Sequence, residues 1–270
     1  MSERRLALIT GASAGIGQAF AEHLASQGFD LVVVARRLDR LEALASRLES
    51  ESQISVLPIV KDLSSRSAPA EILEAVRQQG REIDVLVNNA GYAIATGFQR
   101  TKWEDIAEFL EVLAIGQLEF MHLLIPGMRE RGYGRIVNVA SLAAFAPEFP
   151  GSLYPAVKKF LVSASKACWL ETHGTNVHIT AVCPGYTWSE FHDVLGNRKQ
   201  MNSLPSLMWQ TSDAVAREGW RACEKNRPVV VTGLVNKFLR VVCHVLPVSL
   251  ITRLAPRATK RRRKRQTTSK

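Results

Sequence analysis

The alternation of short apolar runs with helical patterns along residues 6–183 is the feature that most constrains this chain. Leu6–Ile9 forms the first apolar run, and a glycine-rich turn and a helical pattern ending at Gly28 follow it. Further runs of strand length occur at residues 31–35, 54–60, 84–87, 135–140 and 177–183. Regular alternation of strand and helix predicts an α/β fold, namely a doubly wound parallel sheet of the Rossmann type with helices on both faces.

The first turn has the composition of a dinucleotide-binding loop. Glycine at positions 11, 15 and 17 permits a tight turn, close approach of the backbone to a pyrophosphate, and close packing of helix on strand. The N-terminus of the next helix adds free N–H groups and a positive dipole end. A glycine-rich loop without a ligand is the alternative, but its place in a strand-turn-helix unit favours a nucleotide. The expected contacts are Gly11, Ser13, Ala14, Gly15, Ile16 and Gly17.

The second apolar run ends in two arginines, Arg36 and Arg37. An acidic residue at this place would accept a hydrogen bond from the ribose 2′-OH of NAD, whereas arginine makes charge-assisted contacts with a 2′-phosphate. The pair therefore predicts NADP (NADPH) rather than NAD as the cofactor. The alternative is that both arginines are solvated residues at the start of a helix.

Two further runs end in polar residues where doubly wound sheets bind ligands, at the carboxyl ends of their strands. Asp62 and Leu63 follow the third run, although Asp62 could instead cap the next helix. Asn88-Asn89-Ala90-Gly91 follows the fourth run, and its amides could either tie neighbouring strand ends together or contact the cofactor. The sequence leaves these alternatives open.

Three side chains with acid-base and hydrogen-bonding chemistry lie between residues 141 and 158. Ser141 ends the fifth apolar run, and Tyr154 and Lys158 are four residues apart, so a helix would place them on one face. A lysine cation about 6 Å away favours the phenolate and would lower the tyrosine pKa toward neutrality. Tyr154 could then exchange a proton while Ser141 holds the substrate oxygen. Because tyrosine and lysine often occur at this spacing by chance, the surrounding motifs must support the assignment.

Together these motifs resemble the short-chain dehydrogenase/reductase family over residues 6 to about 235. The resemblance rests on residues 10–17, Asp62, residues 88–91, Ser141, Tyr154-Pro155-Ala156-Val157-Lys158 and Pro184-Gly185. It implies NAD(P)-dependent hydride transfer between an alcohol and a carbonyl. Tyr154 would be the proton donor in reduction, Lys158 would lower the pKa of the phenol and hold the nicotinamide ribose, and Ser141 would position the substrate oxygen.

The resemblance also implies contacts along the length of the cofactor. Asp62 would contact the adenine, with Leu63 beside it, and Asn89 and Ala90 would contact the adenine-side ribose. Arg36 or Arg37 would meet the 2′-phosphate, and Pro184, Gly185 and Thr187 would contact the nicotinamide end.

One departure from the family pattern concerns the supply of protons. The family usually has an asparagine on the long central helix, thirteen residues before the proline that is Pro126 here, and counting back reaches Leu113. Glu111 lies nearby, but only a register shift would bring it to that place. Either a water held by a backbone carbonyl relays protons, or the proton supply differs from the usual family member.

Charge and cysteine usage bear on partners and location. The formal net charge is +10, but residues 253–270 hold nine lysines and arginines and no acid, which leaves +1 for residues 1–252. The four cysteines show no CxxC spacing and lie in apolar segments, so we expect free thiols and no metal site. No apolar signal region precedes the first run. These features favour a cytoplasmic protein, with residues 1–235 as a single catalytic domain.

Residues 186–208 correspond to the mobile substrate lid of the family, and they are rich in large apolar side chains. With Phe145 and Phe149 close by and no cluster of basic residues, this composition favours an apolar carbonyl or secondary alcohol as substrate. Long-chain acyl, steroid-like and aromatic compounds all fit. The alternative is that these side chains only pack onto the domain.

The C-terminal part divides into three sections, of which the first, residues 229–233, is an apolar run that predicts a last strand at the edge of the sheet. Residues 236–254 are apolar with interspersed basic residues, as in helices that lie in a membrane interface or cover a neighbouring subunit. Residues 255–270 form a basic tail, expected to be disordered. An apolar helix with a polybasic end is a two-part signal for anionic membranes, so peripheral membrane association is a candidate. Nucleic-acid binding is the weaker alternative, because no aromatic residues interleave the basic run.

Two classes of function fit these motifs. The first is an NADP-dependent oxidoreductase that uses Tyr154 as general acid and base on an apolar carbonyl or alcohol. The second is a non-catalytic dinucleotide-binding sensor or scaffold on the same fold. A binding protein has no reason to keep Ser141, Tyr154 and Lys158 together, so the sequence favours the enzyme, although Leu113 argues slightly against it. The family usually forms dimers or tetramers, and we expect a homo-oligomer.

Overall fold

The structure is a computed structural model of the chain, and it describes residues 4–94, 96–146, 153–190 and 205–245. Most of the predicted lid, the residue Phe149 and the basic tail lie outside the described residues.

The described residues form a parallel sheet of seven strands in the order β3-β2-β1-β4-β5-β6-β9. The chain begins in the middle of the sheet, runs outward to β3 and returns to β4 on the other side of β1. The strand order therefore reverses between β1 and β4, which is where ligands bind in folds of this kind. The strands are β1 (Leu6–Thr10), β2 (Asp30–Ala35), β3 (Val56–Val60), β4 (Ile83–Asn88), β5 (Gly134–Val139), β6 (Val177–Cys183) and β9 (Val229–Val231).

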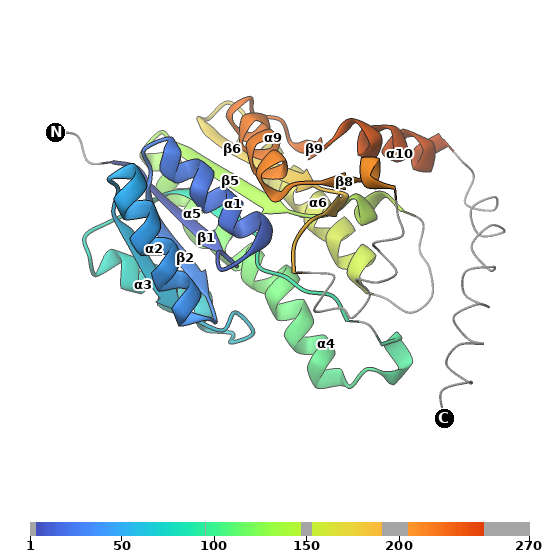
Figure 1. Ribbon diagram of the computed structural model, residues 1–270, viewed down its shortest axis with the longest axis horizontal. Helices are drawn as coiled ribbons and strands as arrows, with labels where there is room; N and C mark the ends of the chain where they lie inside the picture. Colours follow the sequence, from blue (N-terminus) through green and yellow to red (C-terminus); the bar gives the residue numbers. More distant parts are fainter. Residues whose placement is uncertain (1–3, 95, 147–152, 191–204, 246–270) are drawn as a thin grey trace.

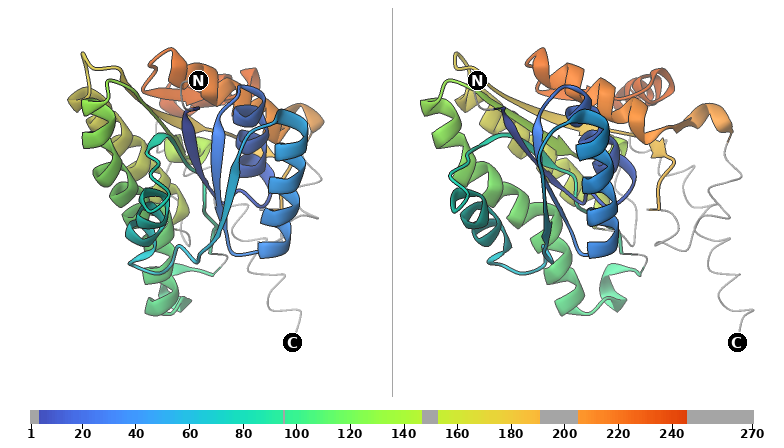
Figure 2. Two further views of the ribbon diagram at one scale, coloured as in Figure 1. Left: turned by 90° about the vertical axis from the view of Figure 1, so that its left-hand side faces the viewer. Right: turned by 60° about the vertical axis from the view of Figure 1, so that its left-hand side comes forward.

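Helices cover both faces of the sheet, as Figures 1 and 2 show. One face carries α1 (Gly15–Ser26), α2 (Leu38–Ser52) and α9 (Ser212–Glu224). The other carries α3 (Ala68–Arg77), α5 (Gly116–Glu130) and part of α6 (Tyr154–Glu171). The predicted doubly wound α/β fold is confirmed.

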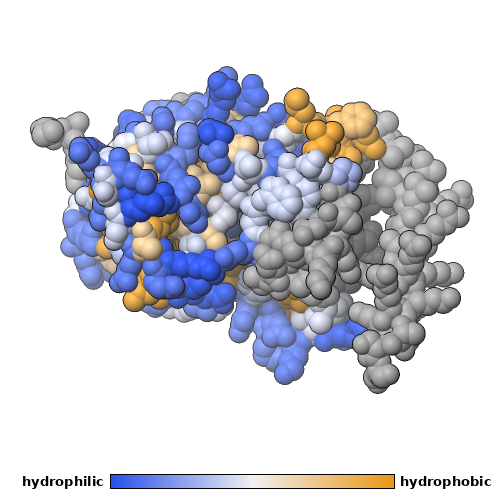
Figure 3. Space-filling view, viewed as in Figure 1, coloured by the Kyte–Doolittle hydropathy of each residue, from blue (hydrophilic) through white to orange (hydrophobic). Residues whose placement is uncertain are grey.

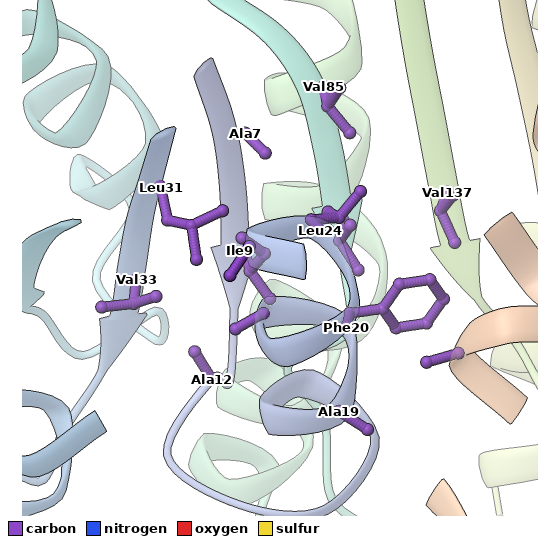
Figure 4. Close-up of a cluster of buried hydrophobic side chains, with 14 of the residues drawn as sticks. Ala7, Ile9, Ala12, Ala19, Phe20, Leu24, Leu31, Val33, Val85 and Val137 are labelled. Carbon is purple, nitrogen blue, oxygen red and sulfur yellow. The ribbon is translucent and has the colours of Figure 1, made fainter. Parts of the chain in front are cut away.

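Strand β1 shows how the sequence produces these two layers. Successive side chains of a strand point to opposite faces. Ala7 and Ile9 accordingly join the cluster under α1, together with Phe20 and Leu24 of that helix, as Figure 4 shows. The alternate residues Leu6 and Leu8 pack with α3 and α5 on the other side. Because both faces are buried, the strand reads as a continuous apolar run.

The long central helix is interrupted where the family asparagine would stand. Its first part, α4 (Trp103–Leu110), passes into a π-helical turn, η2 (Glu111–Ile115), and then into α5. By length and composition the whole helix, Trp103–Glu130, could cross a membrane, but half of its most apolar window is buried in the fold. Its apolar character is accounted for by packing on the sheet.

The C-terminal elements complete the edge next to the site. Strands β7 (Tyr186–Thr187) and β8 (Trp209–Gln210) pair in parallel, and the ring of Trp188 stacks on Trp209 with centroids 4.0 Å apart. Strand β9 pairs with β6 as the last strand, as predicted for residues 229–233. Helix α10 (Leu234–Val245) follows and lies beside η3 (Leu142–Phe145) and η4 (Ser206–Met208).

Candidate active site

The glycine turn between β1 and α1 is closely packed against the end of β4. Gly11 and Gly15 have φ values of +66° and +59°, which disfavour residues with a side chain. A Cβ atom on Gly17 would lie 2.3 Å from the carbonyl oxygen of Gly11, so only glycine fits there. The turn therefore keeps its backbone bare and its helix close, as a pyrophosphate cradle requires.

The amides after β4 have a structural role in this turn. Asn89 Nδ2 donates to the carbonyl oxygens of Thr10, at 3.0 Å, and Gly11, at 3.2 Å. Asn88 Nδ2 donates to Asn138 Oδ1 on β5 at 2.9 Å. Of the two roles left open by the sequence, the side chains of both asparagines take the one that ties strand ends together. A contact of Asn89 or Ala90 with the cofactor remains a prediction.

The two arginines after β2 point to different neighbours. Arg37 Nη2 donates to Ser13 Oγ in the glycine turn at 3.0 Å. Arg36 is largely exposed and lies 3.9 Å from a carboxylate oxygen of Asp62. The structure thus places Arg37 beside the glycine turn and Arg36 beside Asp62.

Arg40 joins Arg37 at this site, although the sequence reasoning did not select it. Both guanidinium groups contact the carboxylate of Glu190, Arg37 at 3.0 Å and Arg40 at 2.5 Å. A signal was present, because Arg40 lies three residues after Arg37, in the first turn of the helix of which Arg37 is the N-cap residue. Glu190 gave no such signal, since it is 150 residues away from Arg40.

Asp62 caps a turn and does not begin a helix. Its Oδ1 accepts a hydrogen bond from the backbone N–H of Ser64 at 2.9 Å, and this bond lowers the pKa of the carboxyl. Helix α3 has Ser67 as its N-cap residue. Leu63 is partly buried in the apolar clusters beside α3 and α4.

Ser141, Tyr154 and Lys158 meet at the carboxyl end of β5. Ser141 precedes η3, and its Oγ accepts a hydrogen bond from Ala143 N at 3.1 Å. The same side chain hydrogen-bonds to the hydroxyl of Tyr154, the first residue of α6. Lys158 is only 3% exposed, and its Nζ lies 5.7 Å from the centroid of the Tyr154 ring. The predicted trio is therefore brought together.

Burial shifts the pKa values of the tyrosine and the lysine in opposite directions. It raises the pKa of Tyr154 to about 12, against a smaller opposing effect of the hydrogen bond with Ser141. It lowers the pKa of Lys158 to about 8. The direction for Tyr154 is opposite to the one expected from spacing, because Lys158 Nζ donates to Val139 O at 2.7 Å and burial outweighs its attraction. Tyr154 is thus fully protonated near neutral pH.

Leu113 lies in η2 as a fully buried member of an apolar cluster that also includes Phe109 and Val157 and borders Tyr154. Glu111 does not replace the usual asparagine, because its carboxylate points toward Arg66, with 3.7 Å between charged atoms. The backbone distortion is retained as the π-helical turn, so it does not depend on an asparagine side chain.

A buried glutamine one turn further on supplies polar atoms near this turn. Gln117 Nε2 donates to Ala90 O at 3.2 Å and to Val112 O at 3.3 Å. Within the part of the chain that the structure describes, its Oε1 and the Oδ1 of Asn88 are buried without a hydrogen-bond partner. Such orphaned acceptors in a polar region are typical positions for a buried water.

The residues expected at the nicotinamide end, Pro184, Gly185 and Thr187, directly follow strand β6. Leu142 N donates to Pro184 O at 2.8 Å, which joins this segment to the Ser141 loop. A Cβ on Gly185 would lie 2.3 Å from Asn236 Oδ1, so a side chain there would displace the buried Asn236. Thr187 is buried, and its Oγ1 donates to Gly185 O at 3.2 Å. Among the described residues no group of His, Cys, Asp or Glu could hold a metal ion.

Comparison with known proteins identifies this arrangement. Residues 5–200 match the short chain dehydrogenase family. The chain belongs to this family. It is 34% identical over 181 residues to the NADP-dependent 3-hydroxy acid dehydrogenase of Salmonella typhi, covering 67% of this chain and 71% of that protein.

Solved structures of short-chain dehydrogenases agree with the fold. The enzyme from Sphingobium yanoikuyae, solved in complex with NADPH, is 31% identical, with a TM-score of 0.78 and coverage of 90% of this chain and 96% of that one. The bulky-bulky ketone specific alcohol dehydrogenase from Comamonas testosteroni is 26% identical, with a TM-score of 0.74 and coverage of 90% and 95%. The family and the oxidoreductase class predicted from the sequence are confirmed.

Proposed function

We propose that this protein is an NADP-dependent reductase or dehydrogenase of apolar ketones, aldehydes or secondary alcohols, with Tyr154 as the general acid and base. The observation that carries the proposal is the hydrogen bond between Ser141 and a protonated Tyr154 beside the buried Lys158. The Salmonella and Sphingobium relatives are named for NADP and NADPH, which supports the same cofactor here.

The residues present fit this cofactor. The bare glycine turn would hold the pyrophosphate, and Gly17 allows the helix N-terminus to pack close to it, because a Cβ there would clash with the carbonyl oxygen of Gly11. Arg37, Arg40 and Ser13 present two guanidinium groups and a hydroxyl close together, a donor set suited to a 2′-phosphate. The nicotinamide supplies the hydride for reduction or accepts it in oxidation. We assign Lys158, Pro184, Gly185 and Thr187 to its end of the site.

Proton transfer follows from the arrangement of three side chains. In reduction, Ser141 holds the carbonyl oxygen and Tyr154 donates its proton to that oxygen. The phenolate left behind lies in a buried site, where an unpaired anion is costly. The Lys158 cation stabilises that phenolate, because its pKa of about 8 keeps it charged at neutral pH. Oxidation runs through the same groups in reverse, with the phenolate as base.

The surroundings of Tyr154 favour an apolar substrate. A small hollow beside the tyrosine is lined mainly by apolar side chains from the segment before α4, from α4 itself and from Leu153; they include Ile94, Phe98, Ile106 and Phe109. Two relatives are named for different substrates: the Comamonas testosteroni enzyme for bulky ketones, and the Salmonella typhi enzyme for 3-hydroxy acids. The lining of this hollow supports the first kind of substrate.

The test is NADPH oxidation with pairs of ketones that differ only in one carboxylate. We expect the neutral bulky ketone of each pair to have a kcat/KM at least about tenfold higher, because the hollow offers a carboxylate no compensating charge. Tyr154→Phe, assayed in parallel, should be nearly inactive. Equal rates for the variant and the wild type would overturn the catalytic assignment, and preference for the keto acids would overturn the substrate class.

We also propose peripheral contact with anionic membranes through α10. Leu234, Phe238 and Val241 recur at helical spacing on this helix and are 83%, 68% and 58% exposed. Figure 3 shows an apolar patch over α10. The sequence after Glu224 contains thirteen lysines and arginines and no acid. An apolar stripe followed by basic residues is what an anionic lipid surface attracts.

Vesicle co-sedimentation tests this contact. Wild type should bind phosphatidylglycerol vesicles but not phosphatidylcholine vesicles, and Phe238→Ser or truncation after Leu254 should each reduce binding. Leu170→Ser is the matched control, because Leu170 is 64% exposed on α6. Equal loss in the control, or no loss in Phe238→Ser and in the truncated protein, would remove the proposal. A homo-oligomer remains a prediction for the same protein, and a cytoplasmic location is consistent with both.

A further inference from the structure

Glu190 occupies the arginine pair that the cofactor phosphate would need. Its two carboxylate oxygens are divided between Arg37 Nη1, at 3.0 Å, and Arg40 Nη1, at 2.5 Å. Arg37 also donates to Ser13 Oγ with its other terminal nitrogen. Glu190, which is distant from both arginines only in sequence, is therefore bound by the same donors that fit a 2′-phosphate.

The position of Glu190 is fixed by its neighbours in sequence. Trp188 stacks on Trp209, and its carbonyl oxygen accepts a hydrogen bond from Ser212 Oγ at 3.0 Å. Ser189 lies against the glycine turn, with its Cβ 2.9 Å from where a Cβ of Gly15 would be. The carboxylate is thus delivered to the arginines by an anchored segment that crosses over the cofactor-binding turn.

The balance of charge makes this carboxylate replaceable by phosphate. Two guanidinium groups face a single negative charge, whereas a 2′-phosphate carries up to two and has more acceptor oxygens. The side chains of Arg37, Arg40 and Glu190 are each about 42–43% exposed, so water screens their attraction. Hydrogen bonds from Arg40 and Arg37 lower the pKa of Glu190, which therefore remains ionised at neutral pH.

The geometry points to Glu190 as a residue that sets cofactor preference by competing with the 2′-phosphate of NADPH for Arg37 and Arg40. Binding of NADPH displaces the carboxylate, whereas NADH has no group that requires its displacement. Glu190 therefore lowers the affinity for NADPH and leaves the affinity for NADH unchanged. This inference rests on the NADP assignment of the proposed function but does not require any particular substrate.

Calorimetric titration of a charge series at position 190 tests the competition. Glu190→Gln removes the negative charge and Glu190→Lys reverses it. The Kd for NADPH should fall by about two- to fivefold in the first variant and further in the second, as expected for loss of an exposed ion pair. 2′,5′-ADP should follow the same trend, whereas NADH and 5′-ADP should show none. The trend should weaken at high salt.

The matched control is Glu22→Gln, which removes an exposed acid that pairs with Arg47 between α1 and α2, away from the glycine turn. It should change none of these dissociation constants. Unchanged NADPH binding across the series, or equal changes for NADPH and NADH, would overturn the inference. Because the readout is binding, tight NADPH binding without turnover of any ketone would instead overturn the proposed reaction and leave the role of Glu190 intact.

Discussion

The two ends of the cofactor site treat charge in opposite ways. At the adenosine end, Arg37, Arg40 and Glu190 keep their charges in partial contact with water and pair with one another. At the catalytic end, Lys158 is buried and Tyr154 is partly buried, and burial raises the pKa of Tyr154 to about 12 and lowers that of Lys158 to about 8. The exposed ion pairs at the first end can be broken at small energetic cost, whereas the second end holds groups whose protonation is set by their surroundings.

This difference separates what a substitution should change. Exposed ion pairs contribute about 0 to 1 kcal/mol each and are weakened by salt. Removing a group that interacts with a buried charge costs several kcal/mol, and groups whose pKa is shifted by burial cluster at sites that perform chemistry. We therefore expect changes at the adenosine end to alter affinity, and changes at the catalytic end to alter kcat.

Among changes of charge at the two ends, Lys158→Met should have the largest effect. It removes the cation that stabilises the phenolate and leaves the carbonyl of Val139 without its buried donor. We expect kcat to fall by about 10²- to 10⁴-fold, the usual contribution of a positioned acid-base group. Stopped-flow measurement of NADPH oxidation at saturating ketone gives this value. A fall in kcat of less than threefold would show that catalysis does not depend on the charge of Lys158.

The double change Arg37→Ala with Arg40→Ala should have the next largest effect. Loss of two charge-assisted contacts should raise the Kd for NADPH by about 10²-fold while the Kd for NADH changes by less than about threefold. The salt dependence of NADPH binding should weaken as well. Arg36→Ala is the control at the same strand end, because Arg36 faces Asp62. Equal losses for both cofactors would contradict the separation of the two ends.

The pH dependence of kcat for reduction should follow the protonation of Lys158. With its pKa lowered to about 8, the cation persists below that pH and is lost above it. Tyr154, with its pKa raised to about 12, stays protonated throughout. The kcat for reduction should therefore be level up to about pH 8 and fall by up to about tenfold per pH unit above it. Lys158→Arg keeps its charge, and whatever activity it retains should show no such fall.

Local patterns explain why much of this molecule could be predicted. The alternation of strands and helices, the glycine turn and the trio Ser141, Tyr154 and Lys158 each arise from residues close together in sequence or from one strand end. Spacing could place Lys158 near Tyr154, but it could not show how deeply the pair is buried. The predicted lowering of the tyrosine pKa was therefore wrong.

Contacts between distant segments could not be predicted in this way. Glu190 reaches Arg40 across 150 residues, and no periodicity in the sequence records that pairing. For Asn89 the sequence offered a tie between strand ends only as one of two alternatives, because the choice depends on the order of strands β1 and β4 in the sheet. The π-helical turn around Leu113 could not be predicted for another reason: the asparagine that usually marks this position in the family is replaced by leucine.

The smallest effect on activity should come from Leu113→Asn. This substitution tests whether the catalytic end needs the apolar side chain at position 113, or whether its proton relay is impaired because the usual asparagine is missing. Leu113 is fully buried among apolar side chains, so an amide there should lower the free energy of unfolding by about 1–3 kcal/mol. Since the π-helical turn exists without asparagine, we expect kcat to change by less than about threefold. Leu124→Asn, at a buried position of α5 on the other cluster, controls for the stability loss. A tenfold rise in kcat in Leu113→Asn alone would show that proton supply limits the wild-type enzyme, and that burial at this end restricts the reaction it serves.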